Sequence, residues 1–383
     1  MSYPRGPAPS DVSAMLAGQI EAVIAALGLE GKRSSDRFRF MAPWPNSDKS
    51  EKVDCYVTGG RAGAWIHWTS DLRGDALDLV AAVLDGGGRK DRTRGDAYIW
   101  ALNFLGLATP KNEGAADKAR REETQRQRIL AAQQQRAKAE AEARLELGAD
   151  RRRARAQWLS GVPLSPGDPV WTYLSARGID LLSLPRLPGA LRWMMADHVD
   201  GDGVVTHWPC MMAAMTLADG TFGCLHRTWI DPNRPGKKAP VEAARKMWPS
   251  PLDDALGGAA IRLSRGASGK PVMKAQPRSE LVVVCEGVED GLSLAMLFPA
   301  ARVEAAGALS LFQSWPIPAS AASVRIAADR DWDKPQAVKA LERASQALCQ
   351  AAPEGVKVGL IYPPDGFKDW NDALMDTNDG GVA

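Results

Sequence analysis

Three short acidic clusters near the C-terminal end of the 383-residue chain are the residues best suited to carry chemistry. Glu286 directly follows the apolar run LVVVC, Asp329 and Asp331 directly follow VRIAA, and Asp369 and Asp372 come a short loop after VKVGLIY. Any one cluster could be a set of solvated loop acids. Closely packed carboxylates repel one another, however, and a divalent cation relieves that repulsion. Hard oxygen ligands suit Mg²⁺ or Mn²⁺ rather than Zn²⁺, so the three clusters predict a metal site that acts on phosphate groups.

The apolar runs before these clusters alternate with helical segments. We expect strands at 281–285, 302–305, 324–328 and 356–362, and helices at 289–298, 308–314 and 335–351. Continuous apolar strands that alternate with helices are typical of a mostly parallel sheet covered on both faces. Ligands of such sheets bind beyond the carboxyl ends of the strands. All three acidic clusters fall there, so the sequence predicts an α/β domain with its site at one edge of the sheet.

A second α+β segment precedes this domain, from about residue 163. We expect a helix at 172–179, strands at 204–207, 211–216 and 256–263, and a strand that opens 223–248 and leads into a basic loop. The loop and its strand carry Arg227, Lys237, Lys238, Arg245 and Lys246. A basic surface beside an acidic metal pocket suits a phosphate-handling enzyme, although a solvated basic loop has the same composition. The stretch GASGKP at 266–271 is too short for a P-loop.

The first half of the chain changes character at about residue 115. Residues 1–107 predict a small α/β module with a helix at 12–29, strands at 54–57 and 64–68 joined by a glycine turn, and a helix at 75–84. From 115 to 158 the chain is rich in Ala, Gln, Arg and Glu and lacks proline. High helix propensity with little apolar surface predicts a long solvated helix joining two domains. A nucleic-acid-binding arm is the alternative.

The composition excludes several classes of protein. A hydrophobic fraction of 45% and a charged fraction of 25% are ordinary for a globular chain and argue against global disorder. The five cysteines are dispersed without a CxxC pair, which argues against a disulfide framework and a structural zinc site. No apolar stretch approaches the ~20 residues that a membrane-spanning helix needs, and the N-terminus has no apolar signal core. We expect a cytoplasmic protein with no membrane contact.

In order and spacing, the acidic clusters resemble a known family. CEGVED, AADRD and KDWND are similar to the motifs of the Toprim domain shared by primases and topoisomerases, and most resemble those of phage and plasmid primases, in which K-D-[FW]-N-D recurs. The segment CLHRTWIDPNRPGKKAPVEAARKMW resembles the region that leads into Toprim in those proteins. The resemblance covers about residues 165–376. It implies a Rossmann-like Toprim fold and a primase of a phage, plasmid or other mobile element.

The resemblance also assigns roles to the residues. It implies that Glu286 is a metal-linked general acid/base, that Asp329 and Asp331 are the principal metal ligands, and that Asp369 and Asp372 hold or tune a second ion. Two Mg²⁺ or Mn²⁺ ions would then assist nucleotidyl transfer from nucleoside triphosphates on a single-stranded DNA template. The basic residues named above would contact template or triphosphate. A separate replicative helicase is the implied partner.

The N-terminal module shows a weaker resemblance, to the zinc-ribbon module that opens many primases. PNSDKS, AWIHW and GDALDLV follow its pattern, but the cysteine ligands are missing and Trp44 stands where the first of them belongs. We expect a zinc-free remnant in which Trp44, Trp65 and Trp68 form a small aromatic core. The expected domains are a zinc-ribbon-like module at 1–110, a charged helical linker at 111–160, a primase subdomain at 161–275 and the Toprim domain at 276–383.

Two other functions remain open at this point. A Toprim nuclease or topoisomerase-like enzyme would cleave DNA, although none of the five tyrosines lies in a recognisable cleavage motif. A non-catalytic protein that binds single-stranded DNA and recruits replication factors would keep the fold without making product.

Overall fold

A computed structural model describes residues 7–34, 36–43, 52–67, 72–85, 93–107, 115–201, 203–249 and 258–378. The chain divides into two compact units, residues 1–147 and 148–383, and each is described by itself. No helix in the described part of the chain is long and apolar enough to cross a membrane.

The described part of the first unit contains an antiparallel sheet of five strands in sequential order, packed with four short helices. The strands are β1 (Gly31–Ser34), β2 (Arg37–Met41), β3 (Lys52–Tyr56), β4 (Trp65–His67) and β5 (Leu72–Gly74). The helices are α1 (Pro9–Ala17), α2 (Ile20–Ala26), α3 (Ala76–Leu84) and α4 (Thr93–Phe104). Their apolar side chains form one buried cluster.

The predicted elements of this unit are largely present, with two differences. The helix expected at 12–29 is broken into α1 and α2 at Gly18 and Gln19. The turn between β3 and β4 does use glycines, since Gly59 and Gly63 have φ values of 73° and 86°, a region that favours glycine. The strands β1, β2 and β5 and the helix α4 were not predicted.

Trp65 is the one member of the predicted aromatic core that the structure describes. It is 5% exposed, and its indole N–H donates to the Asp75 carbonyl over 3.1 Å. Asp75 caps α3 in a reciprocal capping box with Asp78. Trp44 and Trp68 lie outside the described residues, so the zinc-ribbon resemblance and its aromatic core remain predictions.

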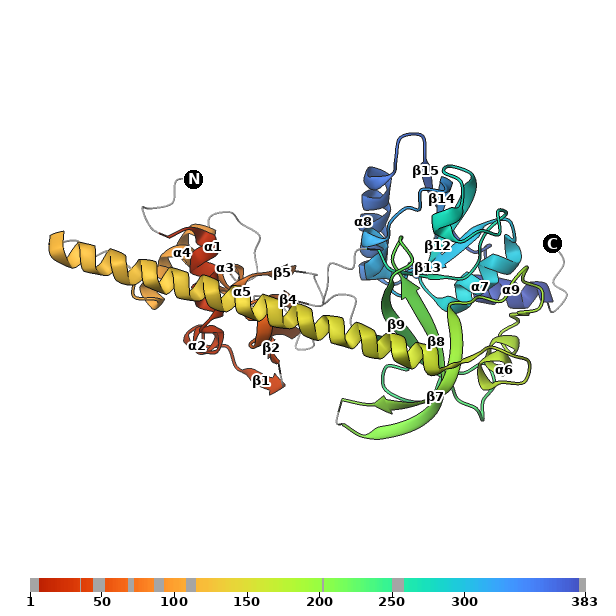
Figure 1. Cartoon of the computed structure of the whole chain (residues 1–383), viewed down its shortest axis with the longest axis horizontal. Coiled ribbons are helices and arrows are strands. Elements are labelled where there is room, and N and C mark those ends of the chain that lie inside the picture. The colour runs from red at the N-terminus through yellow and green to blue at the C-terminus, as the bar shows by residue number, and fades with distance from the viewer. Residues whose placement is uncertain are drawn as a thin grey trace. The chain divides into compact units, whose positions relative to one another are not determined.

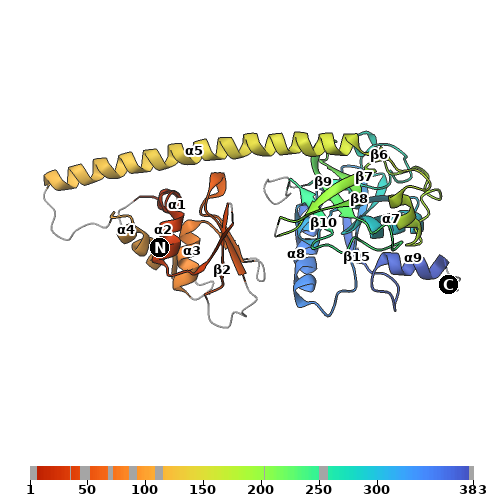
Figure 2. The same ribbon diagram turned by 90° about the horizontal axis from the view of Figure 1, so that it is seen from below.

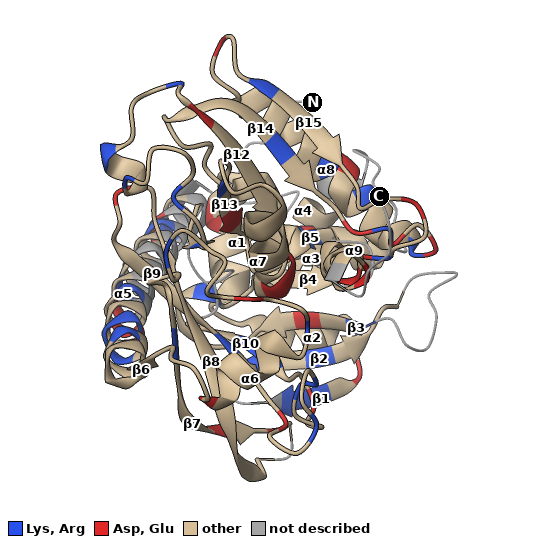
Figure 3. Ribbon diagram, turned by 90° about the vertical axis from the view of Figure 1, so that its right-hand side faces the viewer, with Lys and Arg blue, Asp and Glu red and all other residues tan. Residues whose placement is uncertain are grey.

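The long charged helix is present as α5 (Ala115–Ser160), which starts in the first unit and ends in the second. Lys and Arg residues recur along it (Figure 3). Its last turns belong to the second unit, where Ala154 and Trp158 pack against the sheet.

Within its described residues, the second unit is built on one continuous ten-stranded sheet (Figure 1). Its main order is β10-β9-β8-β11-β13-β12-β14-β15, with β7 paired to β8 and β6 paired to β7. The strands are β6 (Val162–Pro163), β7 (Leu191–Val199), β8 (Val205–Thr216), β9 (Phe222–Trp229), β10 (Arg245–Trp248), β11 (Ala260–Arg262), β12 (Glu280–Cys285), β13 (Arg302–Ala305), β14 (Ala321–Ala327) and β15 (Lys357–Ile361).

The strands β13, β12, β14 and β15 form the parallel half of this sheet. The helices α7 (Val288–Leu297) and α9 (Trp370–Asn378) contact each other, and α7 packs on β12 and β13. The helix α8 (Pro335–Ala351) and the 3-10 helix η3 (Leu309–Ser314) lie on the other side (Figures 1 and 2). This is the predicted α/β fold, with both faces of a parallel sheet covered.

The antiparallel half, β7 to β10, differs more from the expectation. The strand β7 was not predicted, β8 is one strand of 12 residues rather than two, and β10 occupies part of the expected basic loop. The helix α6 (Pro169–Ser175) is shorter than the expected 172–179 and starts three residues earlier. The short strand β11 pairs antiparallel with both β8 and β13 and so joins the two halves.

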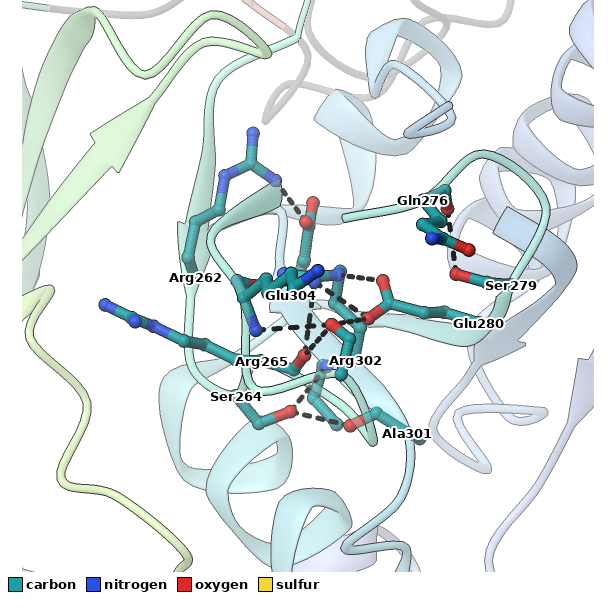
Figure 4. Close-up of polar contacts among 12 residues, drawn as sticks. Arg262, Ser264, Arg265, Gln276, Ser279, Glu280, Ala301, Arg302 and Glu304 are labelled. Atoms are coloured by element: carbon teal, nitrogen blue, oxygen red, sulfur yellow. Dashed lines mark hydrogen bonds and ion pairs between the residues drawn. The ribbon is translucent and has the colours of Figure 1, made fainter. Parts of the chain in front are cut away.

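A buried ion pair lies where β11, β12 and β13 meet (Figure 4). The Arg302 guanidinium donates to both carboxylate oxygens of Glu280 over 2.6 and 3.0 Å, and both side chains are 1% exposed. Burial raises the pKa of Glu280, but hydrogen bonds from Arg302 and Ser268 outweigh it and leave the pKa below its ordinary value. Arg302 also donates to the Arg265 and Lys270 carbonyls. The GASGKP loop is thus held by Arg302 as part of the scaffold.

We predict that Arg302→Met lowers the free energy of unfolding by about 3–5 kcal/mol, because it leaves a buried carboxylate without its partner. Replacing Glu280 by Met as well should recover a substantial part of that loss. Urea denaturation of the two variants measures both effects. Arg325→Met is the control, since Arg325 forms no ion pair in the described structure. A loss at Arg302 no larger than at Arg325 would contradict the predicted role of the pair.

Candidate active site

Glu286 lies just beyond the carboxyl end of β12, where the neighbouring strand fixes its backbone. Its carbonyl accepts a hydrogen bond from the Gly307 N–H over 2.9 Å. Gly287 then turns the chain into α7, and a Cβ atom at this position would lie 3.2 Å from Asp290 Oδ2. The E-G pair therefore supplies one carboxylate and leaves room for a second.

Asp329 and Asp331 follow β14 in a loop that Arg330 ties to the loop after β15. The Arg330 N–H donates to the Lys368 carbonyl over 2.8 Å, and its guanidinium donates twice to the Pro363 carbonyl over 2.8 and 3.1 Å. Because Arg330 stands between the two aspartates, these bonds fix the backbone that carries both. They also hold this loop against the one that carries the third acidic cluster.

The third cluster opens α9. Asp369 Oδ1 accepts the Asp372 N–H over 2.8 Å, so Asp369 caps the first turn of the helix. Asn371 anchors that turn to α7: its N–H donates to Asp290 Oδ1 over 3.2 Å and its side-chain amide donates to Ser293 Oγ over 3.1 Å. Asn371 is buried, and the sequence analysis did not single it out.

A cavity of about 270 Å³ lies beside the first two clusters. Glu286, Asp329 and Asp331 line it together with three aromatic rings, those of Phe312, Trp332 and Tyr362, and with apolar side chains of η3 and α8. The structure therefore brings these three acids to one place. Asp369 and Asp372 do not line the cavity, but the charge of Asp369 is among those that raise the pKa of Asp329.

Electrostatic repulsion marks this group of acids. Burial, followed by the charges of Glu286, Asp369 and Asp331, raises the pKa of Asp329 to about 6. Burial also raises the pKa of Glu286, against the opposing charge of Arg245. Perturbed carboxylates gathered in a cleft are typical of a functional site.

Asp290 belongs to this group, although the sequence analysis passed over it. Burial and the charges of Asp329, Asp369 and Glu289 raise the pKa of Asp290 to about 8. Asp290 stands one helical turn after Glu286 inside CEGVED, in the acidic first turn of α7 (red in Figure 3). The spacing of one helical turn between Glu286 and Asp290 was the sequence signal that could have identified Asp290.

The chemistry of this donor set fits a divalent cation. Asp329 and Asp331, with Glu286 beside them, offer hard oxygen ligands, and a cation would offset the repulsion that raises the pKa of Asp329. Asp331 Oδ1 contacts the Lys334 ammonium at 2.8 Å and lies 3.9 Å from that of Lys368. In the described residues, no three His, Cys, Asp or Glu side chains converge as ligands of one ion. Coordination would therefore require rotation of these side chains and exchange of the lysine contacts.

Two family models match the chain, and each covers less than half of it. Residues 148–258 match a domain of unknown function, DUF7146, and residues 281–379 match the Toprim domain. The second match runs from β12 through α9 and contains all three acidic clusters. The C-terminal part of this chain is a Toprim domain. The resemblance to the Toprim domain that was inferred from its motifs is confirmed.

Comparisons with solved structures and with curated proteins add little. The primase fragment of the bacteriophage T7 primase-helicase protein is 17% identical, with 57% of this chain and 76% of that chain covered and a TM-score of 0.33. The catalytic core of E. coli primase is 15% identical, with 55% and 69% covered and a TM-score of 0.34. Scores this low transfer no function to this chain. The comparison with curated proteins found no match.

Glu289 of the Toprim domain is held by the preceding segment of the chain. It is 4% exposed, accepts the Tyr173 hydroxyl over 2.7 Å and lies 3.2 Å from the Lys238 ammonium. Burial raises the pKa of Glu289, but the charge of Lys238 and the hydrogen bond from Tyr173 outweigh it and lower the pKa to about 2. These contacts attach α6 and the basic loop to α7.

Three of the five predicted basic residues, Arg227, Arg245 and Lys246, lie in strands of the antiparallel half of the sheet, on two different faces. Paired residues of neighbouring antiparallel strands share a face, and successive residues alternate. Arg227 pairs with Lys246, whereas Arg245 pairs with Thr228. Arg245 therefore lies on the face opposite to Arg227 and Lys246, and its charge acts on Glu286.

Two tryptophan rings lie close to Arg227 on its face of the sheet. The Arg227 guanidinium lies 5.0 Å from the ring centroid of Trp229 and 5.7 Å from that of Trp248. The Lys246 ammonium donates to the Val199 carbonyl. The structure thus brings Lys238 and Arg245 to the Toprim acids but not Arg227 or Lys246, while Lys237 is exposed in the loop. The binding roles of all five remain predictions.

His226 provides a test of this packing. It is 3% exposed on the same face as Arg245, and burial lowers its pKa to about 4 against the opposing charge of Glu289. The folded state therefore binds fewer protons than the unfolded state, whose histidine pKa is about 6.5. The stability that follows from a neutral His226 is complete above pH 6.5 and is lost as the pH falls toward 4.

We predict that His226→Leu reduces the loss of stability between pH 7 and pH 4.5 by on the order of 2 kcal/mol, since a tenfold change in a protonation constant corresponds to ~1.4 kcal/mol. Urea denaturation of wild type and variant at both pH values measures the difference. Equal losses in the two proteins would show that His226 is not held neutral.

Proposed function

We propose that the chain is a DNA primase that joins ribonucleoside triphosphates into short RNA primers on single-stranded DNA. The observation that carries the proposal is the group of electrostatically coupled carboxylates, Glu286, Asp329 and Asp331, around one cavity of a Toprim domain. A basic residue, Arg245, acts on the same group. Carboxylates that hold cations, next to a positively charged side chain that attracts phosphate, suit nucleotidyl transfer.

In this proposal Asp329 and Asp331 hold one Mg²⁺ or Mn²⁺ ion, and Asp369 and Asp372 hold or tune a second. Such ions, when bound, make the attacking 3′-hydroxyl more acidic and stabilise the leaving pyrophosphate. Glu286 takes up the proton of that hydroxyl, a role for which its raised pKa suits it.

Two of the basic residues have different roles in this proposal. Arg245 is exposed and faces the acids, so it contacts the triphosphate or the template backbone. Lys238 is engaged with Glu289 and orients α7, so its effect on substrate is indirect. A separate helicase, which the resemblance to phage and plasmid primases implies, is proposed to supply the single-stranded template.

We expect Glu286→Gln and Asp329→Asn each to lower primer synthesis at least ~100-fold, the range that loss of a general acid/base produces. Incorporation of labelled ribonucleotides on single-stranded DNA with Mg²⁺ or Mn²⁺ measures the effect. The melting temperature should not fall in either variant, because each change removes a repelling charge. Synthesis that survives both substitutions would refute the proposal.

The same assay separates the alternative functions. A Toprim nuclease would shorten labelled DNA in the absence of nucleotides, and the two substitutions would abolish that cleavage. A non-catalytic protein would bind single-stranded DNA, with affinity that falls steeply as salt rises, and would form no product under either condition.

Arg245→Gln and Lys246→Gln form a matched pair on opposite faces of one strand. If Arg245 contacts one phosphate of the template, its loss reduces the slope of log affinity against log salt by about 0.7 for single-stranded DNA. Lys246→Gln should leave that slope unchanged. Fluorescence anisotropy with a labelled oligonucleotide at several salt concentrations measures both, and equal slopes for the two variants would exclude the proposed contact.

A further inference from the structure

The cavity beside the acidic clusters has an apolar side that phosphate chemistry does not require. Val338 and Leu341 of α8 and Phe312 of η3 line it together with Glu286 and Asp329. Its volume of about 270 Å³ lies just below the range of pockets for drug-sized ligands, ~300–1,000 Å³. A space of this size suits one planar ring system with polar groups at one end.

Trp332, which lines the cavity, is unusually exposed for a tryptophan. It follows Asp331 directly, and it is 61% exposed, the only tryptophan among the exposed large apolar residues of the described structure. Its ring lies edge-on to Tyr362, with centroids 5.9 Å apart at 74°, and the Arg330 guanidinium lies 5.0 Å from its centroid. Exposing so large an apolar surface is unfavourable, and exposed aromatic side chains beside a site are typical of ligand contacts.

Two polar groups on this lining have no partner among the residues that the structure describes. The Tyr362 hydroxyl and the Glu342 carboxylate form no hydrogen bond or ion pair with any residue that the structure describes. A phenolic hydroxyl donates and accepts, and a carboxylate accepts. Together with a stacking ring, such groups match the polar edge and the flat face of a nucleobase.

We propose that this cavity, the aromatic pocket, binds the base of a nucleoside triphosphate whose phosphates would be held by the cations proposed at Asp329 and Asp331. The inference rests on the nucleotidyl transfer proposed above and adds where the base lies and which residues hold it. Trp332 stacks on the base, and the apolar side chains of α8 form the far wall. Because every base has a flat face, stacking of this kind tolerates all four bases.

Two substitutions change the pocket in opposite ways. Trp332→Ala removes the stacking surface and should raise the KM for nucleotide about 5- to 150-fold, the range measured for loss of one base–aromatic contact. Ala337→Phe fills the pocket from α8 and should raise the KM likewise. Trp332→Phe keeps an aromatic ring and should recover most of the affinity. All three variants should keep the wild-type melting temperature to within a few degrees.

Leu182→Ala is the control, because Leu182 is 72% exposed in the same unit and does not line the pocket. It should leave the KM unchanged. A KM that responds no more to Trp332→Ala or Ala337→Phe than to Leu182→Ala would overturn the proposal.

A second measurement does not depend on catalysis. Photo-crosslinking of the full chain with 8-azido-ATP in the presence of Mg²⁺, followed by peptide mapping, should label residues 332–342 or Tyr362. The label should be lost in Ala337→Phe. Labelling elsewhere, or none, would overturn the aromatic pocket even if the chain makes primers. Labelling there without primer synthesis would instead support the pocket and count against the proposed function.

Discussion

Repulsion among carboxylates at one edge of a parallel sheet is the constraint on which the rest of the C-terminal unit depends. Parallel strands end together, so Glu286 after β12 and Asp329 after β14 meet, and burial followed by the charges of the neighbouring acids raises the pKa of Asp329 to about 6. Without other contacts, repulsion between the carboxylates would push these loops apart. Arg330 binds the loop after β14 to the loop after β15, and Asn371 binds α9 to Asp290. The acids stay together because hydrogen bonds from Arg330 and Asn371 hold the segments that carry them.

The sequence predicted the parallel half of the fold closely. The bounds expected for β13 and α8, 302–305 and 335–351, agree with the observed elements. Buried parallel strands are continuous apolar runs and amphipathic helices show their period directly, so local patterns suffice. The acidic clusters were found for the same reason, because the first two directly follow such a run and the third comes a short loop after one. Their roles, by contrast, depend on ligands that local patterns do not reveal.

The parts of the fold and of the site that the sequence did not predict depend on pairing between distant segments. The strand β10 reads as a basic loop until its register with β9 is known, and that register decides that Arg245 faces the acids while Lys246 does not. Asp290 is one acid among three in CEGVED, and only the approach of α9 and β14 makes it unusual. In the first unit, β1 (GKRS) lacks the alternation of apolar and polar residues that would have marked it. The strand β2 (RFRFM) does alternate, and the sequence analysis passed over that signal.

The strand β11 joins the two family regions into one sheet. It lies between residues 148–258 and 281–379 in sequence, and it pairs with β8 of one region and β13 of the other. A fragment cut to either family boundary would expose an unpaired strand edge, which is a ready template for aggregation. Soluble expression therefore requires residues 259–280 together with both neighbours.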